Sequence, residues 1–317
     1  MSRVAIACQG GGSHTAFTAG FLRHVFENWD DEDELVGLSG TSGGALNAVA
    51  AWYGLATEGR ERAVELLDAV WEDVAADDPI DRVTNATAVW TRRVETSGLP
   101  VPTVSPYLLP ATAWAESEFR ALVERHVDFE TIRALCGDPE RPSLVVGTVN
   151  VNAGEFETFV DEEVTADAVL ASAAIPELFR AVEIHGHYHW DGLFSQNPPV
   201  KDLMRGDGGR KPEELWVVQI NPQQRSDLPK TNEEISDRRN ELAGNISLNQ
   251  EIGFIERVND WIDAGYLPES EFTKASVHRI EMGEQFHCST KADRSPAFID
   301  ELLALGERRA EAFLADR

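Results

Sequence analysis

The sequence predicts an α/β fold with a mainly parallel central sheet. Along its 317 residues, short continuous apolar runs alternate with longer stretches in which apolar residues recur at helical spacing. Continuous apolar runs are typical of parallel strands, because such strands are buried on both faces of their sheet. With 42% apolar residues the chain can bury a substantial core, so we expect a single domain over residues 1–317.

The individual elements are expected where these patterns occur. Strands are expected at residues 4–8, 35–38, 144–149, 157–160, 182–184, 188–190 and 215–220. Helices are expected at residues 16–22, 45–53, 58–76, 113–126, 165–174, 232–263 and 296–315. The apolar stripe within 232–263 indicates a helix or a helix pair packed on the sheet.

A Gly-Thr-Ser-Gly-Gly motif follows the second expected strand. In a GxSxG motif the serine stands in a strained turn between a strand and a helix, and side chains at the flanking glycines would collide with backbone. The motif therefore predicts Ser42 as an exposed nucleophile, supported by Gly40, Gly43 and Gly44. A glycine-rich turn with a capping serine is the alternative interpretation of the pentapeptide alone.

Three consecutive glycines, Gly10, Gly11 and Gly12, follow the first expected strand. Bare N–H groups in such a loop can converge on an anion, which in an acyl hydrolase is the oxyanion of the tetrahedral intermediate. We expect these glycines to form an oxyanion hole, with His14 helping to position their loop. A nucleotide site is disfavoured, because the third glycine of a dinucleotide fingerprint would fall at Thr15 and no Gly-Lys-Ser or Gly-Lys-Thr is present.

A serine nucleophile needs a base, and Asp191 is the candidate. It ends a short aromatic strand-like segment and precedes Gly192 at a turn. A carboxylate is a weak base in water, so the site must desolvate Asp191, which tends to raise its pKa. The alternative is an aspartate that only opens a turn.

The order and spacing of the glycine loop, the serine motif and the Asp-Gly pair resemble those of the patatin-like phospholipases. The Ala-Ser-Ala-Ala-Ile-Pro segment at 171–176 is also similar to the family, and the resemblance covers most of residues 3–221. It implies a three-layer α/β/α fold with a catalytic core at about 3–221 and a helical part at about 231–317 packed on it.

The same resemblance implies a lipid acyl hydrolase that cleaves carboxylic esters through a Ser42–Asp191 dyad and an acyl-enzyme, with no cofactor and no metal. The chain departs from the family pattern at three positions. His14 stands where the family usually has Arg or Lys, Thr15 where it has Gly, and Leu193 where a second glycine often follows Asp-Gly.

Two alternatives to the dyad remain open. A Ser-His-Asp triad on an α/β-hydrolase fold could draw its histidine from His278 or His287, although only two expected strands precede Ser42. A catalytically degenerate member that binds lipids or partner proteins is the second alternative, and the presence of Ser42 and Asp191 disfavours it.

His185, His187 and His189 alternate along the chain, as ligands on one strand face would. Gly186 interrupts them, however, so we expect a hairpin with the first two histidines at its exposed tip rather than a metal site.

The formal charge of −27 restricts partners and setting. The chain has no basic patch to neutralise phosphates, so nucleic acid is not expected as a partner. The acid excess repels itself in dilute solution and is screened in concentrated salt, which predicts a halophilic protein of a high-salt cytoplasm.

Three cysteines without framework spacing, Cys8, Cys136 and Cys288, indicate reduced thiols, with Cys8 buried in the first strand. The chain enters that strand directly, which leaves no room for a signal peptide, and no apolar run is long enough to span a membrane. We therefore expect a cytoplasmic protein with at most peripheral membrane contact.

The proline-punctuated segment 99–110 is either a lid or an irregular loop. The lipid head group, the acyl length and the oligomeric state remain open.

Overall fold

The computed structural model describes residues 2–97, 104–205 and 210–317. Within them one mixed sheet has the strand order β5-β6-β3-β2-β1-β7-β8, with β4 paired to β3. The central neighbours β3, β2, β1, β7 and β8 are all parallel, whereas β4, β5 and β6 add antiparallel pairs. The bounds are β1 (Arg3–Cys8), β2 (Glu34–Gly40), β3 (Ser143–Asn150), β4 (Glu155–Val160), β5 (Val182–Ile184), β6 (His187–Asp191), β7 (Glu214–Gln219) and β8 (Ser276–Glu281).

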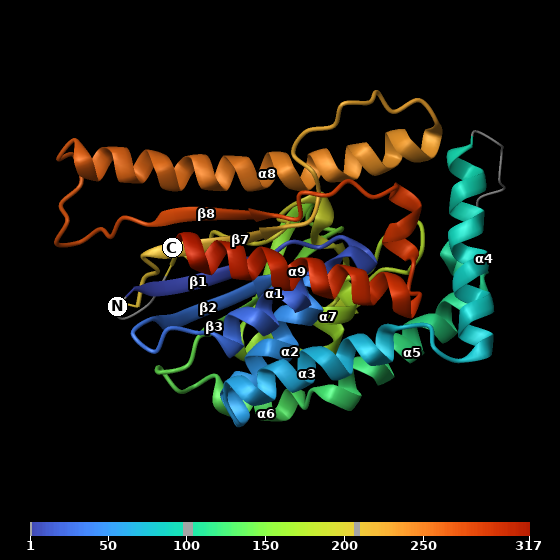
Figure 1. Cartoon of the computed structure of the whole chain (residues 1–317), viewed down its shortest axis with the longest axis horizontal. Coiled ribbons are helices and arrows are strands. Elements are labelled where there is room, and N and C mark those ends of the chain that lie inside the picture. The colour runs from blue at the N-terminus through green and yellow to red at the C-terminus, as the bar shows by residue number, and fades with distance from the viewer. Residues whose placement is uncertain (1, 98–103, 206–209) are drawn as a thin grey trace.

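Helices cover both faces of this sheet (Figure 1). On one face lie α1 (Ala16–Glu27), α2 (Gly43–Thr57), α3 (Arg60–Val74), α5 (Pro110–His126), α6 (Phe129–Leu135), α7 (Ala166–Ser172) and α9 (Pro296–Asp316). The long helix α8 (Asn232–Asp263) crosses the other face, and α4 (Pro79–Thr96) stands at one end of the sheet (Figure 1). The predicted α/β/α arrangement is confirmed.

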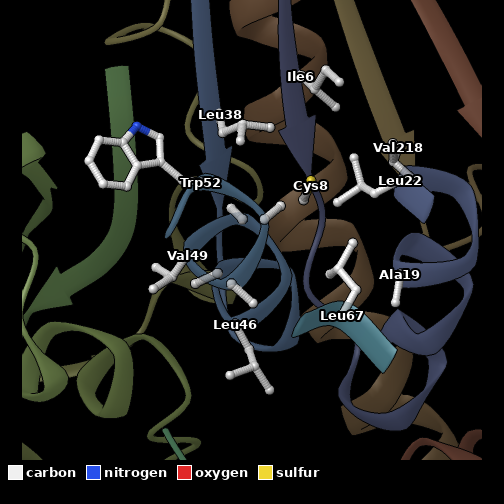
Figure 2. Close-up of a cluster of buried hydrophobic side chains, with 14 of the residues drawn as sticks. Ile6, Cys8, Ala19, Leu22, Leu38, Leu46, Val49, Trp52, Leu67 and Val218 are labelled. Carbon is white, nitrogen blue, oxygen red and sulfur yellow. The ribbon is translucent and has the colours of Figure 1, made fainter. Parts of the chain in front are cut away.

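Two apolar layers hold these elements together. Alternate residues of β1 point to opposite faces of the sheet, so Ile6 and Cys8 join the layer beneath α1 and α2, as Figure 2 shows. Ala5 and Ala7 face the other way and pack beneath α8. Because β1 is buried on both faces, its sequence is continuously apolar, which is the pattern that predicted a central parallel strand.

Most of the expected elements are present, and α8 is one helix rather than a pair. Its first turn is fixed by a capping box between Thr231 and Glu234. Three elements were missed by the sequence analysis: α4, α6 and β8. β8 lies at the edge of the sheet and is mostly polar, and α4 has few buried positions, so neither carries a strong apolar pattern.

The predicted β5–β6 hairpin is confirmed. His185 and Gly186 both have positive φ (52° and 81°), which is the conformation of a two-residue type I′ turn. His187 is exposed but belongs to β6, while His189 is buried with Nε2 3.0 Å from Glu157 Oε2. Over the described ranges, no helix is both long and apolar enough to cross a membrane.

Candidate active site

Strand β3 aligns the two strands that carry the predicted catalytic residues. Strand β2 runs parallel to the first half of β3, and its last residue, Gly40, pairs with Val146. Strand β6 runs antiparallel to the second half of β3, and its last residue, Asp191, pairs with Thr148. The two strands approach from opposite directions and end near each other, so the turn after β2 meets the turn after β6.

Ser42 lies in a strained turn between β2 and α2. Its φ of 56° and ψ of −129° form a conformation that side-chain-bearing residues rarely adopt. The surrounding backbone is packed so closely that a Cβ on Gly44 would collide with the carbonyl group of Cys8. This is the strand-turn-helix geometry that the sequence motif predicts.

Buried side chains fix the backbone of this turn. The Ser42 N–H donates to Ser172 Oγ at 2.9 Å, and the Ser172 hydroxyl donates to the carbonyl of Gly147 at 2.7 Å. The Thr41 hydroxyl donates to the carbonyl of Gln196 at 2.8 Å. In the sequence, the 171–176 segment is notable only for its family resemblance, whereas in the structure its Ser172 holds the turn.

Asp191 is fully buried beside this turn. Its Oδ1 accepts the N–H of Leu193 at 2.9 Å, while Oδ2 lacks a well-formed hydrogen bond within the described residues. Burial raises the pKa of Asp191 to about 7, and the Leu193 N–H and the Ser42 hydroxyl limit that rise. The Ser42 hydroxyl therefore acts on the charge of the Asp191 carboxyl, and both groups line the same cleft.

The glycine loop lies directly against the serine turn. A Cβ on Gly10 would come within 2.8 Å of Ser42 Cβ. The Gly10 N–H donates to Asn197 Oδ1 at 2.6 Å, which differs from the expectation that all three glycines face a substrate. Among the described residues no such internal acceptor meets the N–H groups of Gly11 and Gly12, so these two donors are available.

Gln9 is a supporting residue that the sequence analysis missed. Its side chain is fully buried and makes four hydrogen bonds, two as donor and two as acceptor. The donors reach Asn197 and Asn245, and the acceptor oxygen takes the N–H groups of Ile220 and Asn221. The only sequence signal is a polar residue between a buried strand and a glycine run.

His14 lies behind the glycine loop and is buried. Its Nε2 is 2.7 Å from Thr290 Oγ1, and its ring contacts Phe286 and Phe298. Burial lowers the pKa of His14 to about 3, with the positive charge of Lys291 acting in the same direction. His14 is therefore neutral at physiological pH and brings no fixed positive charge to the loop.

Ser42, Asp191 and Gly10–Gly12 line one cleft of about 1150 Å³. Part of its lining is apolar, from Ala88, Val104, Pro106, Ile175, Leu178 and Leu193. Another part of the lining, which we call the polar wall, consists of Asn232, Glu233, Ser236, Asp237, Asn240 and Glu241 of α8. Of the predicted lid at 99–110, residues 99–103 lie outside the described residues, and Val104, Ser105 and Pro106 line the cleft.

The histidines considered for a triad lie elsewhere. His278 is on β8, with Nε2 3.6 Å from Glu214, and the Nδ1 of His287 accepts the N–H of Ser289 at 3.2 Å. No histidine of the described chain lines the cleft that contains Ser42.

A family model for patatin-like phospholipases matches residues 6–204. The chain belongs to this family. The matched region contains the glycine loop, the serine turn and Asp191, which the fold brings together in one cleft. Members of the family are lipid acyl hydrolases.

Solved structures that match the chain include VipD from Legionella pneumophila. It has 14% sequence identity and a TM-score of 0.49, and the match covers 99% of this chain and 67% of VipD. The ExoU–SpcU complex of the type III secretion system of Pseudomonas aeruginosa matches at 13% identity with a TM-score of 0.34, covering 98% of this chain and 52% of that one. The chain has no significant match among curated proteins.

Proposed function

We propose that this protein hydrolyses acyl esters of lipids through a Ser42–Asp191 dyad. The observation that carries the proposal is the pairing of a strained serine with a fully buried carboxyl whose pKa is raised to about 7. A base with a pKa near the working pH combines adequate basicity with a useful ionised fraction. Burial thus turns a weak carboxylate base into one suited to neutral pH.

The first half of the reaction forms an acyl-enzyme. Ionised Asp191 accepts the hydroxyl proton of Ser42 while the serine oxygen attacks the ester carbonyl carbon. Collapse of the tetrahedral intermediate breaks the bond to the alcohol, which leaves with the proton held by Asp191. In the second half, water attacks the acyl-serine, Asp191 accepts the water proton, and the free acid departs as Ser42 is regenerated.

The glycine loop stabilises the negative oxygen of each tetrahedral intermediate. The N–H groups of Gly11 and Gly12 are the donors we assign, because Gly10 already donates to Asn197. Loss of one such donor typically costs about 3 kcal/mol of transition-state stabilisation. His14, Gln9 and the packing around Gly12 hold the donors in place, so little reorganisation is needed during the reaction.

A triad on an α/β-hydrolase fold is the less favoured candidate. In the described chain no histidine lines the cleft, and the only strands that precede Ser42 there are β1 and β2. The apolar lining accommodates an acyl chain, which supports a lipid or another acyl ester as substrate.

The decisive experiment treats the wild type and Ser42→Ala with a fluorophosphonate probe and a p-nitrophenyl ester. We expect labelling and turnover of the wild type and neither for Ser42→Ala, with equal thermal midpoints. Thr41→Ser keeps the hydroxyl beside the nucleophile and serves as the control. Labelling of Ser42→Ala at another serine would refute the assignment, and a histidine substitution that abolishes turnover without unfolding would favour the triad.

The acid excess leads us to propose a high-salt setting as well. A net charge of −27 opposes compaction unless salt screens it. We expect the protein to lose structure on dialysis into dilute buffer and to regain it in concentrated potassium chloride, followed by circular dichroism. Full stability in dilute buffer would contradict this proposal.

A further inference from the structure

The carbonyl group of Gly10 is held by two buried amide side chains. Asn197 Nδ2 donates to this carbonyl at 3.4 Å, and Asn221 Nδ2 donates to it at 3.2 Å. Asn197 also accepts the N–H of Gly10 through Oδ1 at 2.6 Å, so its amide holds both polar groups of this glycine. The two asparagines are only 2% and 6% exposed, so solvent does not readily replace their contacts.

The position of the Gly10 carbonyl sets the direction of the next N–H group along the chain. The peptide bond between Gly10 and Gly11 is planar and trans, so this carbonyl and the Gly11 N–H point in opposite directions. Two donors on the carbonyl side therefore fix where the N–H points on the other side. Gly11 lines the cleft, and within the described ranges its N–H meets no internal acceptor. The two asparagines thus orient a donor that is available to a ligand.

The same contacts strengthen the Gly11 N–H as a donor. Hydrogen bonds that follow one another polarise each other, so an amide that donates to a peptide carbonyl makes the N–H of that peptide a better donor. Donors that are already oriented stabilise an oxyanion strongly, because they need no reorganisation when the negative charge develops. The asparagine contacts serve both requirements at Gly11.

Gln9 sets the spacing of the two asparagines. Its Nε2 donates to the backbone carbonyl of Asn197 at 3.0 Å, and its Oε1 accepts the backbone N–H of Asn221 at 2.7 Å. Asn197 lies on the segment that follows Asp191, whereas Asn221 follows β7, which pairs with β1. The network therefore joins the glycine loop to the segment after the catalytic base and to the end of β7.

Asn221 lies beyond the region that the family model matches. That region, residues 6–204, includes Gly10, Gly11 and Asn197. The C-terminal part of the chain therefore adds a contact of its own to the glycine loop. A neutral amide suits this place, because a carboxylate there would repel the Gly10 carbonyl and add negative charge to the cleft beside the oxyanion.

We propose that Asn221 and Asn197 are positioning residues for the oxyanion donor of Gly11. The inference rests on the proposed function, because the oxyanion forms only when Ser42 attacks an ester. Both asparagines act through the peptide between Gly10 and Gly11 rather than on the substrate. Their loss should therefore slow the chemical step and leave substrate binding and the pH dependence of the reaction unchanged.

The main test is Asn221→Leu, which keeps the shape of the side chain and removes the donor to Gly10 without adding charge. We expect kcat on a p-nitrophenyl ester to fall about tenfold to a hundredfold, with KM changed less than about twofold and an unchanged pH profile. Asn221→Asp, which turns an acceptor towards the same carbonyl, is the second variant and should lose at least as much kcat. Unchanged kcat in both variants would overturn the proposal.

Asn259 of α8 provides the matched control. It also holds a backbone segment by both polar groups, donating to the carbonyl of Ala275 at 2.9 Å and accepting the N–H of Ala275 at 3.1 Å, away from the cleft. Asn259→Leu should lower the thermal midpoint and keep the wild-type kcat. A loss of kcat as large as that of Asn221→Leu would show that the effect is a general one and would overturn the proposal.

A thionoester analogue of the substrate separates oxyanion stabilisation from a general disturbance of the site. Sulfur accepts hydrogen bonds weakly, so a well-placed donor favours hydrolysis of the oxygen ester over the thionoester. We expect Asn221→Leu to reduce this rate ratio about tenfold, because only the oxygen ester loses the help of Gly11. Equal losses on the two esters would overturn the positioning role and leave the proposed function intact, whereas turnover by Ser42→Ala would overturn the proposed function instead.

Discussion

The two sides of the cleft are built in different ways. On the β2 side, buried backbone groups make close contacts, such as the Ser42 N–H to Ser172 Oγ at 2.9 Å and the Gly10 N–H to Asn197 Oδ1 at 2.6 Å. On the α8 side, half-buried side chains form ion pairs, of which Arg92 with Glu233 at 2.6 Å is typical. The β2 side fixes the positions of the groups around Ser42, whereas the α8 side determines how charged side chains are distributed in the cleft.

This difference indicates how the two sides respond to substitution. Buried backbone contacts cannot be replaced by solvent, so a change there displaces reacting atoms. The partly exposed ion pair of Arg92 with Glu233 contributes little to stability, whereas the buried carboxylate of Glu241 cannot be replaced by solvent. We therefore expect large losses on every ester from changes near Ser42, and smaller losses from changes at the partly exposed positions of the polar wall.

The largest expected effect is that of Asp191→Asn. The amide cannot accept the proton of Ser42, so we expect kcat to fall roughly a thousandfold or more on every ester. Initial rates on a p-nitrophenyl ester at saturating substrate give this value. Asp161→Asn also neutralises a half-buried carboxyl with a raised pKa, but away from the cleft, and should keep its kcat.

Although Asp191→Asn should lower kcat, it should increase the stability of the folded protein at neutral and alkaline pH. The pKa of Asp191 is about 7 in the folded chain and 3.8 as a free group, so the folded state binds more protons between these pH values. The stability of the wild type should fall as pH rises through about 7, whereas Asp191→Asn lacks this loss. We expect the variant to be the more stable protein at pH 8, by at most roughly 4 kcal/mol, with the difference vanishing towards pH 4. Parallel urea titrations that lack this trend would contradict the raised pKa.

Gly12→Ala should have the next largest effect. Gly12 has a φ of 60°, and a Cβ there would collide with the carbonyl of Lys291, so the loop must move. Displacing an oxyanion donor should lower kcat about a hundredfold. Gly154 has a similar φ of 72° and open space around it, so Gly154→Ala tests the cost of the backbone conformation alone. If both variants keep wild-type kcat, the loop does not stabilise the oxyanion.

The contrast between the two sides also explains what the sequence could predict. Ser42 and the three glycines occupy short motifs at the ends of the parallel strands β2 and β1, and parallel strands bring such ends to one edge of a sheet. The proximity of these residues was therefore predictable. The approach of Asp191 was not, because β6 runs antiparallel to β3 and the register of Thr148 with Asp191 depends on tertiary contacts.

The α8 side was not predictable from local patterns. Lys291 reaches Gly12 from far along the chain, and Gln9 bonds Asn245 across 236 positions. Helix α4 contributes Arg92 to the cleft, although the helix was not predicted because its apolar pattern is weak. In a sequence, the polar residues of an amphipathic helix predict a solvent-exposed surface, and only the packing of the helix shows that they line a cleft.

The change of activity with pH should be set by Asp191, which lies beside the Ser42 turn. Asp191 acts as a base only when ionised, and its pKa is about 7. We expect kcat/KM of the wild type to fall about tenfold per pH unit below that value, on phospholipid and neutral ester alike. Full pH profiles of the two substrates measure this. A limb that appears with the phospholipid only would place the titrating group in the polar wall instead.

The smallest effect expected on the β2 side is that of His14→Ala. The substitution removes the contact with Thr290 and leaves a cavity behind the glycine loop, so we expect kcat to fall about fivefold to tenfold. Because burial holds the pKa of His14 near 3, the loss should be the same at every pH between 6 and 9. Thr290→Val removes the same hydrogen bond from the other partner and should reproduce part of the loss. Unchanged kinetics would show that His14 does not position the loop, and a loss confined to low pH would show that it acts through its charge.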